Sequence, residues 1–226
     1  MKKSGLKSSQ GFSLIELMIG MAITLVLLGI VSSVVSQAMS VNQRETRKAD
    51  ALVSAQAALN VISREVGNSG FGLFTDPTTQ TPANGIVIAD SGKNRIRVRS
   101  NFENEGDYTA PSSDTVYNTN GPGEDVTYYF DSATKSIVRY DAHPPTGISS
   151  TSVVVNKISS ITFKYVNYTS SSSTVTETDT PTSATGRVRI TVSVDLDPVV
   201  GQPDNQKVTF MSDVTLRNSN YMLRQY

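Results

Sequence analysis

Residues 12–35 read FSLIELMIGMAITLVLLGIVSSVV, and this apolar stretch decides the fold of the N-terminal part of the chain. Glu16 is the only charged residue within it. At a rise of about 1.5 Å per residue the stretch makes a helix of roughly 36 Å, longer than the hydrocarbon core of a bilayer at about 30 Å. We therefore expect residues 12–35 to form a transmembrane helix.

Basic residues ahead of this stretch indicate its orientation. Lys2, Lys3 and Lys7 precede it, and positive charge beside a membrane span stays on the cytoplasmic side. A secretory signal has a shorter apolar stretch of about 7–15 residues that ends at a small-residue cleavage site. No Ala-x-Ala pattern closes this one, so the sequence predicts an anchored chain with a cytoplasmic N-terminus.

Glu16 is the feature that a plain anchor does not explain. An ionised carboxylate in the middle of a bilayer costs about 2.5–3.5 kcal/mol, and a position near the inner end relieves part of this cost. Cleavage between Gly11 and Phe12 would create a new α-amino group four residues before Glu16. In a bundle of such helices, the amine of one subunit can pair with Glu16 of its neighbour.

The segment GFSLIELMIG, residues 11–20, resembles the prepilin-type cleavage and methylation signal of type IV pilins and type II secretion pseudopilins. The resemblance implies that a prepilin peptidase cuts after Gly11 and methylates the new N-terminal Phe12. It also implies that Glu16 serves in assembly. Other pilin subunits and the bacterial inner membrane are then the expected partners, and the chain later reaches the pilus at the cell surface.

The helix is predicted to continue beyond the membrane over residues 36–67, because residues 36–66 contain neither Pro nor Gly. An apolar stripe follows one face of its second half: Leu52, Ala55, Leu59, Ile62 and Val66. The stripe covers barely two heptads, which favours packing on the domain that follows over a free coiled coil. The helix is expected to end at Gly67-Asn68-Ser69-Gly70, where Gly can take the left-handed conformation. The run from Ala57 to Gly72 resembles the helix end of W-type minor pilins and J-type pseudopilins.

From Phe71 onward apolar and polar residues alternate, as in antiparallel strands with one packed and one wet face. The strands are expected around Ile96 and Val98; around Val126, Tyr128 and Phe130; over Ile137–Tyr140, joined to the preceding run by a hairpin turn at Ser132–Lys135; in one region of Val153–Val155 with Ile161, Phe163 and Tyr165; over Val188–Leu196; and over Lys207–Arg217. Two polar stretches, residues 169–185 and 197–206, are expected to be surface loops. Leu216-Arg217-Asn218 resembles the closing strand of W-type and J-type proteins.

The predicted fold class is therefore α+β, with a long N-terminal helix packed on a C-terminal antiparallel β-rich domain. The expected parts are a cleaved leader at residues 1–11, the membrane and assembly helix at 12–35, the amphipathic continuation at 36–67 and the β-rich domain at 71–226.

Composition and motifs argue against catalysis and cofactors. The chain has no cysteine and a single histidine, His143, which precedes two prolines. One histidine without cysteine cannot build the usual zinc site, and no serine lies in a Gly-x-Ser-x-Gly motif. Oxygen ligands cluster at residues 103–107 and at Asp195, Asp197 and Asp204, but without calcium-loop spacing. We expect no enzyme, no metal, no cofactor and no small-molecule substrate.

Charge does not favour nucleic acid either, since 20 Lys and Arg balance 20 Asp and Glu. Arg95, Arg97 and Arg99 lie on one face of a predicted strand, and together with Arg187 and Arg189 they suggest a basic patch for DNA as one interpretation. The favoured alternative is a solvated or edge strand kept soluble by charge.

The sequence thus predicts a minor type IV pilin that polymerises through its N-terminal helix to prime or cap a filament. A J-type pseudopilin of type II secretion is the alternative within this class. From another class comes a membrane-anchored binding or adhesin domain that does not polymerise.

Overall fold

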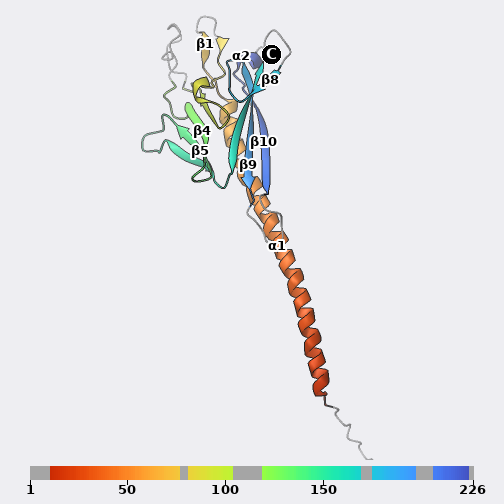
Figure 1. Cartoon of the computed structure of the whole chain (residues 1–226). Helices are drawn as coiled ribbons and strands as arrows, with labels where there is room; N and C mark the ends of the chain where they lie inside the picture. The colour runs from red at the N-terminus through yellow and green to blue at the C-terminus, as the bar shows by residue number, and fades with distance from the viewer. Residues whose placement is uncertain (1–10, 77–80, 104–118, 169–174, 197–205, 224–226) are drawn as a thin grey trace, which may run out of the picture. The chain divides into compact units, whose positions relative to one another are not determined.

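The computed structural model describes residues 11–76, 81–103, 119–168, 175–196 and 206–223. It shows one long helix, α1 (Leu14–Gly67), followed by antiparallel sheets, which confirms the predicted α+β class (Figure 1). The chain divides into two compact units between Thr46 and Arg47. The second half of α1 therefore belongs to the same unit as the sheets.

The globular unit contains two four-stranded antiparallel sheets. The first has the order β3 (Arg95–Arg99), β4 (Asp125–Asp131), β5 (Ser136–Asp141), β6 (Thr151–Val155). The second has the order β10 (Lys207–Thr215), β9 (Thr185–Asp195), β7 (Ser160–Tyr168), β8 (Val175–Thr178). Smaller elements are the strand pair β1 (Phe74–Asp76) and β2 (Thr81–Pro82), the 3-10 helix η1 (Ile88–Asp90) and the short helix α2 (Asn220–Leu223).

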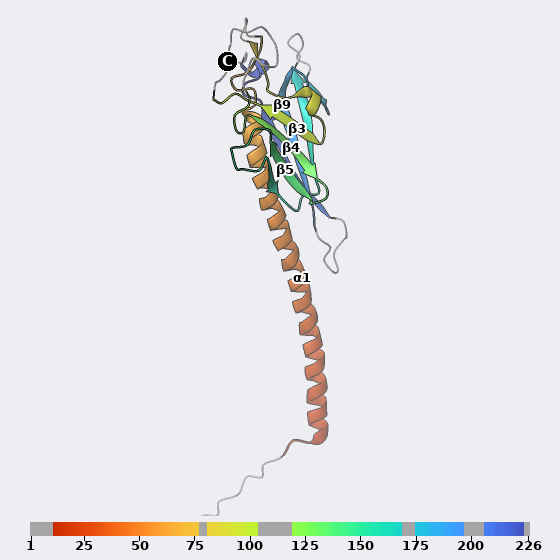
Figure 2. The ribbon, with the colours of Figure 1, turned by 90° about the vertical axis from the view of Figure 1, so that its left-hand side faces the viewer.

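Alternate residues of both sheets meet α1 in a single core. In β9, the valines and isoleucine at every second position are buried, as the alternation predicts. Tyr128, Phe163 and Tyr165 are the largest buried aromatic residues of this core. The backbone N–H of Phe163 in β7 donates to the carbonyl of Lys93 at 2.7 Å, which ties the second sheet to the segment that leads into β3. Figure 2 shows β3, β4 and β5 together as one layer.

The buried face of α1 differs from the predicted stripe at two points. Ala55, Leu59, Ile62 and Val66 are buried as expected, and Ala51 and Ala58 are buried as well. The prediction for Leu52 was wrong, because its side chain is 38% exposed. Alanine lets the helix backbone approach the sheets closely, so the small residues take the positions next to the strands and Leu52 lies on the flank.

The end of α1 is fixed by two glycines that no other residue would replace easily. Gly70 has φ +77° and Gly85 has φ +73°. A Cβ added to Gly85 would lie 2.0 Å from the backbone nitrogen of Gly70. Both glycines are hydrogen-bonded to the backbone of Arg99. The N–H of Gly70 donates to the Arg99 carbonyl at 2.9 Å, and the N–H of Arg99 donates to the Gly85 carbonyl at 2.7 Å. The prediction of a left-handed glycine after the helix is confirmed at Gly70.

Three expectations about the strands need correction. Val153–Val155 and Ile161–Tyr165 belong to different strands, β6 and β7, of different sheets. Residues 169–185 are not one loop, because β8 lies within them and Thr185 is the buried first residue of β9. The last strand ends at Thr215, and Leu216 is buried just beyond it. Leu216 continues the alternation of buried residues after Val214, and its N–H donates to the Gly186 carbonyl at 2.9 Å.

Candidate functional site

The predicted processing site lies directly in front of α1. Gly11, Phe12 and Ser13 precede the helix, and the side chain of Phe12 is 81% exposed. The carbonyl of Ser13 accepts a hydrogen bond from the N–H of Leu17 at 3.1 Å, so Ser13 is the first residue that the helix engages. Residues 1–10, which contain the basic leader, lie outside the described residues.

Glu16 lies in the first turn of α1. A carboxylate there interacts favourably with the positive end of the helix dipole. Ser13 and Glu16 also have the Ser-x-x-Glu spacing of a capping box, with Phe12 and Leu17 at the positions of a hydrophobic staple. Glu16 therefore has two distinguishable uses, since an amide can take the capping position but cannot neutralise an amine.

The first part of α1 is apolar on every side. Its large hydrophobic residues from Phe12 to Val41 are all at least half exposed. By length and composition α1 is suited to cross a membrane, and none of its most apolar window is buried within the chain. The hydroxyl of Thr24 donates to the carbonyl of Gly20 at 2.8 Å, which satisfies this polar group inside the helix. A helix that is apolar all round is stable in lipid or among other apolar helices.

A family model for the prokaryotic N-terminal methylation motif matches residues 6–32. The chain carries a type IV pilin-like prepilin signal. The match covers residues 6–11 of the predicted leader, the Gly11–Phe12 junction, Glu16 and most of the apolar stretch. Searches of curated proteins and of solved structures returned no match. The motif supports a pilin-like or pseudopilin protein, processed by a prepilin peptidase and assembled with pilin subunits, and the W-type or J-type subtype stays a prediction.

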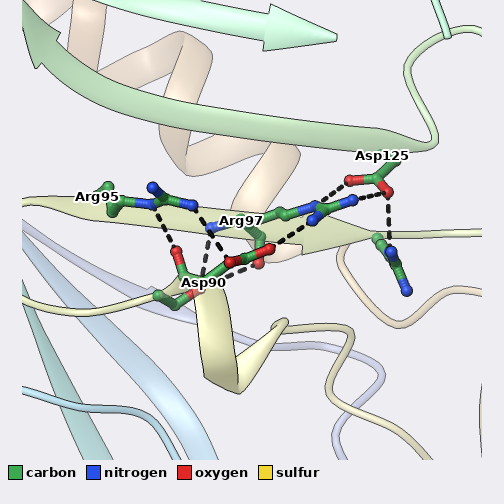
Figure 3. Close-up of polar contacts among 6 residues, drawn as sticks. Asp90, Arg95, Arg97 and Asp125 are labelled. Carbon is green, nitrogen blue, oxygen red and sulfur yellow. Dashed lines mark hydrogen bonds and ion pairs between the residues drawn. The ribbon is translucent and has the colours of Figure 1, made fainter. Parts of the chain in front are cut away.

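In the globular unit, the arginines of β3 form a network with two aspartates (Figure 3). The carboxylate of Asp125 accepts hydrogen bonds from Arg97 Nε at 2.7 Å, from Arg97 Nη2 at 2.6 Å and from Arg99 Nε at 2.9 Å. Arg97 also pairs with Asp90 of η1, and Arg95 Nη2 lies 3.4 Å from the same carboxylate. Figure 3 shows Asp90 between Arg95 and Arg97.

Within this network, the contact between Arg97 and Asp125 favours the charged form of both side chains. Burial by itself raises the pKa of Asp125, but the hydrogen bonds from Arg97 and the charge of Arg99 hold that pKa below its ordinary value. The hydrogen bond to Asp125 is also the main reason why the pKa of Arg97 is raised. These arginines are thus paired with carboxylates of the chain itself. Arg189 lies in β9 of the other sheet and pairs with Asp213 and Glu177.

A second network joins α1 to the first sheet. Glu65 accepts a hydrogen bond from the Tyr128 hydroxyl at 2.7 Å and from Arg139 Nε at 3.1 Å. Arg139 Nη1 in turn lies 3.3 Å from Asp141 Oδ2, which also accepts the N–H of Gly123 at 2.9 Å. Burial, helped by the charge of Glu65, raises the pKa of Tyr128. The network fixes the rotation of α1 against β4 and β5.

The remaining predicted sites lie apart from one another. His143 follows β5, and its backbone N–H donates to Asp141 Oδ1 at 3.0 Å. Within the described part of the chain, no group of three or more His, Asp or Glu side chains is arranged to hold a metal ion. Residues 104–107, Asp197 and Asp204, named above as possible oxygen ligands, lie outside the described residues. Sequence reasoning missed the Asp125 and Glu65 networks, because their members are distant in the chain.

Proposed function

We propose that the chain is a minor type IV pilin, a structural subunit that polymerises through its N-terminal helix and primes or caps a filament. Its N-terminus lies in the cytoplasm before processing, α1 crosses the inner membrane once, and the globular unit faces the periplasm. Head-to-tail contacts that do not close on themselves generate a helical filament. The apolar first part of α1 supplies the surface for such contacts.

The observation that carries the proposal is the continuity between the processing signal and the helix. The methylation motif ends inside α1, and the apolar side chains around it are exposed in the isolated chain. An anchor needs only apolar residues. This segment also has the predicted cleavage junction four residues before an acid, Glu16.

In the proposed mechanism the carboxylate of Glu16 pairs with the methylated amine of Phe12 on an adjacent subunit. Away from water an unpaired carboxylate costs about 2.5–3.5 kcal/mol, and a subunit in the correct register removes most of this cost. The pair therefore selects register as well as partner. The globular unit then contacts other minor pilins at the tip.

The test compares Glu16→Gln with Glu16→Ala in a bacterium that makes the filament. Glutamine keeps the side chain that a capping box uses and removes only the charge, whereas alanine removes both. We expect both variants to be cleaved and held in the membrane, and both to be absent from sheared filaments. Normal incorporation of Glu16→Gln would reject the pairing mechanism and leave Glu16 as a helix cap.

The same cells separate the alternatives. Recovery of the chain without substitutions in a secretion pseudopilus would identify it as J-type. Its retention in the membrane without any filament would favour an anchored binding domain.

A further inference from the structure

The outer edge of the second sheet is a long, straight strand with unused backbone groups. β10 pairs with β9 over all nine residues from Lys207 to Thr215 without a bulge. Figure 1 shows β10 at the border of the sheet, beside β9. Its inner side lies near α1, where Ser63 Oγ and Ser212 Oγ are 3.3 Å apart.

The hydrogen bonds at both ends show which residues point away from β9. The N–H of Leu216 donates to the carbonyl of Gly186 at 2.9 Å, and the N–H of Leu196 donates to the carbonyl of Gln206 at 2.8 Å. Because bonded and unbonded pairs alternate along an antiparallel ladder, the even-numbered residues of β10 bond to β9. The odd-numbered residues, from Lys207 to Thr215, direct their N–H and C=O groups outward. Among the described residues, none bonds to these groups.

In the described part of the chain, the other three edges of the two four-stranded sheets are covered, irregular or short. Residues 85–92 cover β3, through bonds such as the Val87 N–H to the Arg97 carbonyl at 2.9 Å. β6 is five residues long and its register with β5 is irregular, and bulges of this kind discourage strand addition. β8 has only four residues. β10 is thus the long open edge of the described sheets.

The side chains of β10 do not repel an added strand. Lys207 is paired with Asp195 at 3.3 Å, and Asp213 accepts a hydrogen bond from Arg189 Nε at 2.8 Å. Between them the strand is uncharged, and Met211 at its centre is 68% exposed. The charges near the two ends of β10 are thus neutralised, and its central residue is apolar and exposed. Such an edge suits a partner strand whose residue opposite Met211 is uncharged.

We propose that β10 receives an extended strand of about nine residues from another protein chain, which adds to the second sheet. The length of the edge argues against β8 of a second copy, because four residues would leave half of β10 open. A two-fold pair of β10 strands would make the helices that pack on the two sheets run in opposite directions, which does not suit two copies anchored in one membrane. The last point alone rests on the proposed function.

The experiment uses the full chain in detergent micelles and a capped synthetic peptide with the sequence of residues 206–216. This peptide can pair antiparallel about Met211 and carries no helix that restricts its orientation. Amide hydrogen exchange is followed at Thr209, Met211 and Asp213. We expect rapid exchange without peptide, and exchange slowed by about tenfold or more at saturating peptide.

Two substitutions provide the matched comparison. Met211→Pro removes one outward donor, and proline is tolerated on an edge strand whose N–H faces solvent. Met211→Thr keeps the donor and changes only the side chain. We expect peptide protection of Thr209 and Asp213 to be lost in Met211→Pro and kept in Met211→Thr. If Met211→Pro does not fold, the exchange measurement on the unmodified chain decides alone.

Three results would overturn the proposal. Exchange at these amides that saturating peptide leaves unchanged would show that the edge takes no strand. Protection that survives in Met211→Pro would place the peptide elsewhere. Slow exchange that depends only on protein concentration would make a second copy the occupant. None of these results bears on the processing of Phe12, so failure here is distinguishable from failure of the pilin assignment.

Discussion

Replacing Asp125 with asparagine tests whether the arginine network stabilises the globular unit. The Asp125 side chain is 3% exposed and accepts three hydrogen bonds from two arginines. Removing one partner of a buried ion pair costs about 3–5 kcal/mol. The side chains of Arg97 and Arg99 are 25% and 33% exposed, so water recovers part of this loss. We therefore expect Asp125→Asn to lower the free energy of unfolding by about 2–3 kcal/mol.

The assay is urea unfolding of the full chain in mild detergent, followed by tyrosine fluorescence because the chain contains no tryptophan. Asp131→Asn is the matched control, since Asp131 lies at the other end of β4 and bonds only to its own turn. Asparagine retains an acceptor for that turn. We expect this control to leave the urea midpoint nearly unchanged, because surface substitutions of this kind have small effects.

The pH dependence gives a second measure of the same ion pair. The folded-state pKa of Asp125 is lowered, so its stabilisation is present above the unfolded pKa of about 3.9 and is lost as pH falls through the folded value. The difference in free energy of unfolding between the chain without substitutions and Asp125→Asn should be constant at neutral pH and shrink in acid. A difference below about 0.5 kcal/mol at pH 7 would refute the reasoning, as would one that does not change with pH.

Further predictions concern the helix end and the tyrosines. Gly85→Ala should lower the melting temperature strongly, because the added Cβ would lie 2.5 Å from the Arg99 carbonyl oxygen. Gly92→Ala is the control, since the atom nearest to its added Cβ would be 3.9 Å away. Equal melting temperatures of the two variants would contradict the close approach at Gly85. Tyr128→Phe should cost about 1–2 kcal/mol in urea unfolding by removing the hydrogen bond to Glu65; an unchanged midpoint would show that Arg139 alone satisfies Glu65. Burial raises the pKa of Tyr128 and of Tyr165, so an ultraviolet titration should show both protonated when exposed tyrosines ionise near pH 10, with stability falling above that pH as the unfolded chain ionises.

Linear features of this chain could be predicted from the sequence. The alternation at Val188–Leu196 identified β9, and the turn at Ser132–Lys135 identified the β4–β5 hairpin. In these elements one residue in two is buried, so the period itself carries the information. The N-terminal signal could also be predicted, because leader, junction and acid are neighbours in the chain.

Features that depend on tertiary packing could not be predicted. Ala51 and Ala58 are too weakly apolar to mark a buried face, and Leu52 is apolar yet lies on the flank of α1. β8 consists of Val, Thr and Glu, and its polar composition indicated a loop. The pairing of Arg97 with Asp125 depends on the register of β3 with β4, which alternation alone does not specify.

The central claim is that Glu16 pairs with the newly formed amine of Phe12 on an adjacent subunit, which requires cleavage after Gly11. Mass spectrometry of the protein purified from its native membrane tests this most directly. The account predicts a mature chain that begins at Phe12 and carries one methyl group on its α-amino nitrogen. A chain that still begins at Met1 would contradict it.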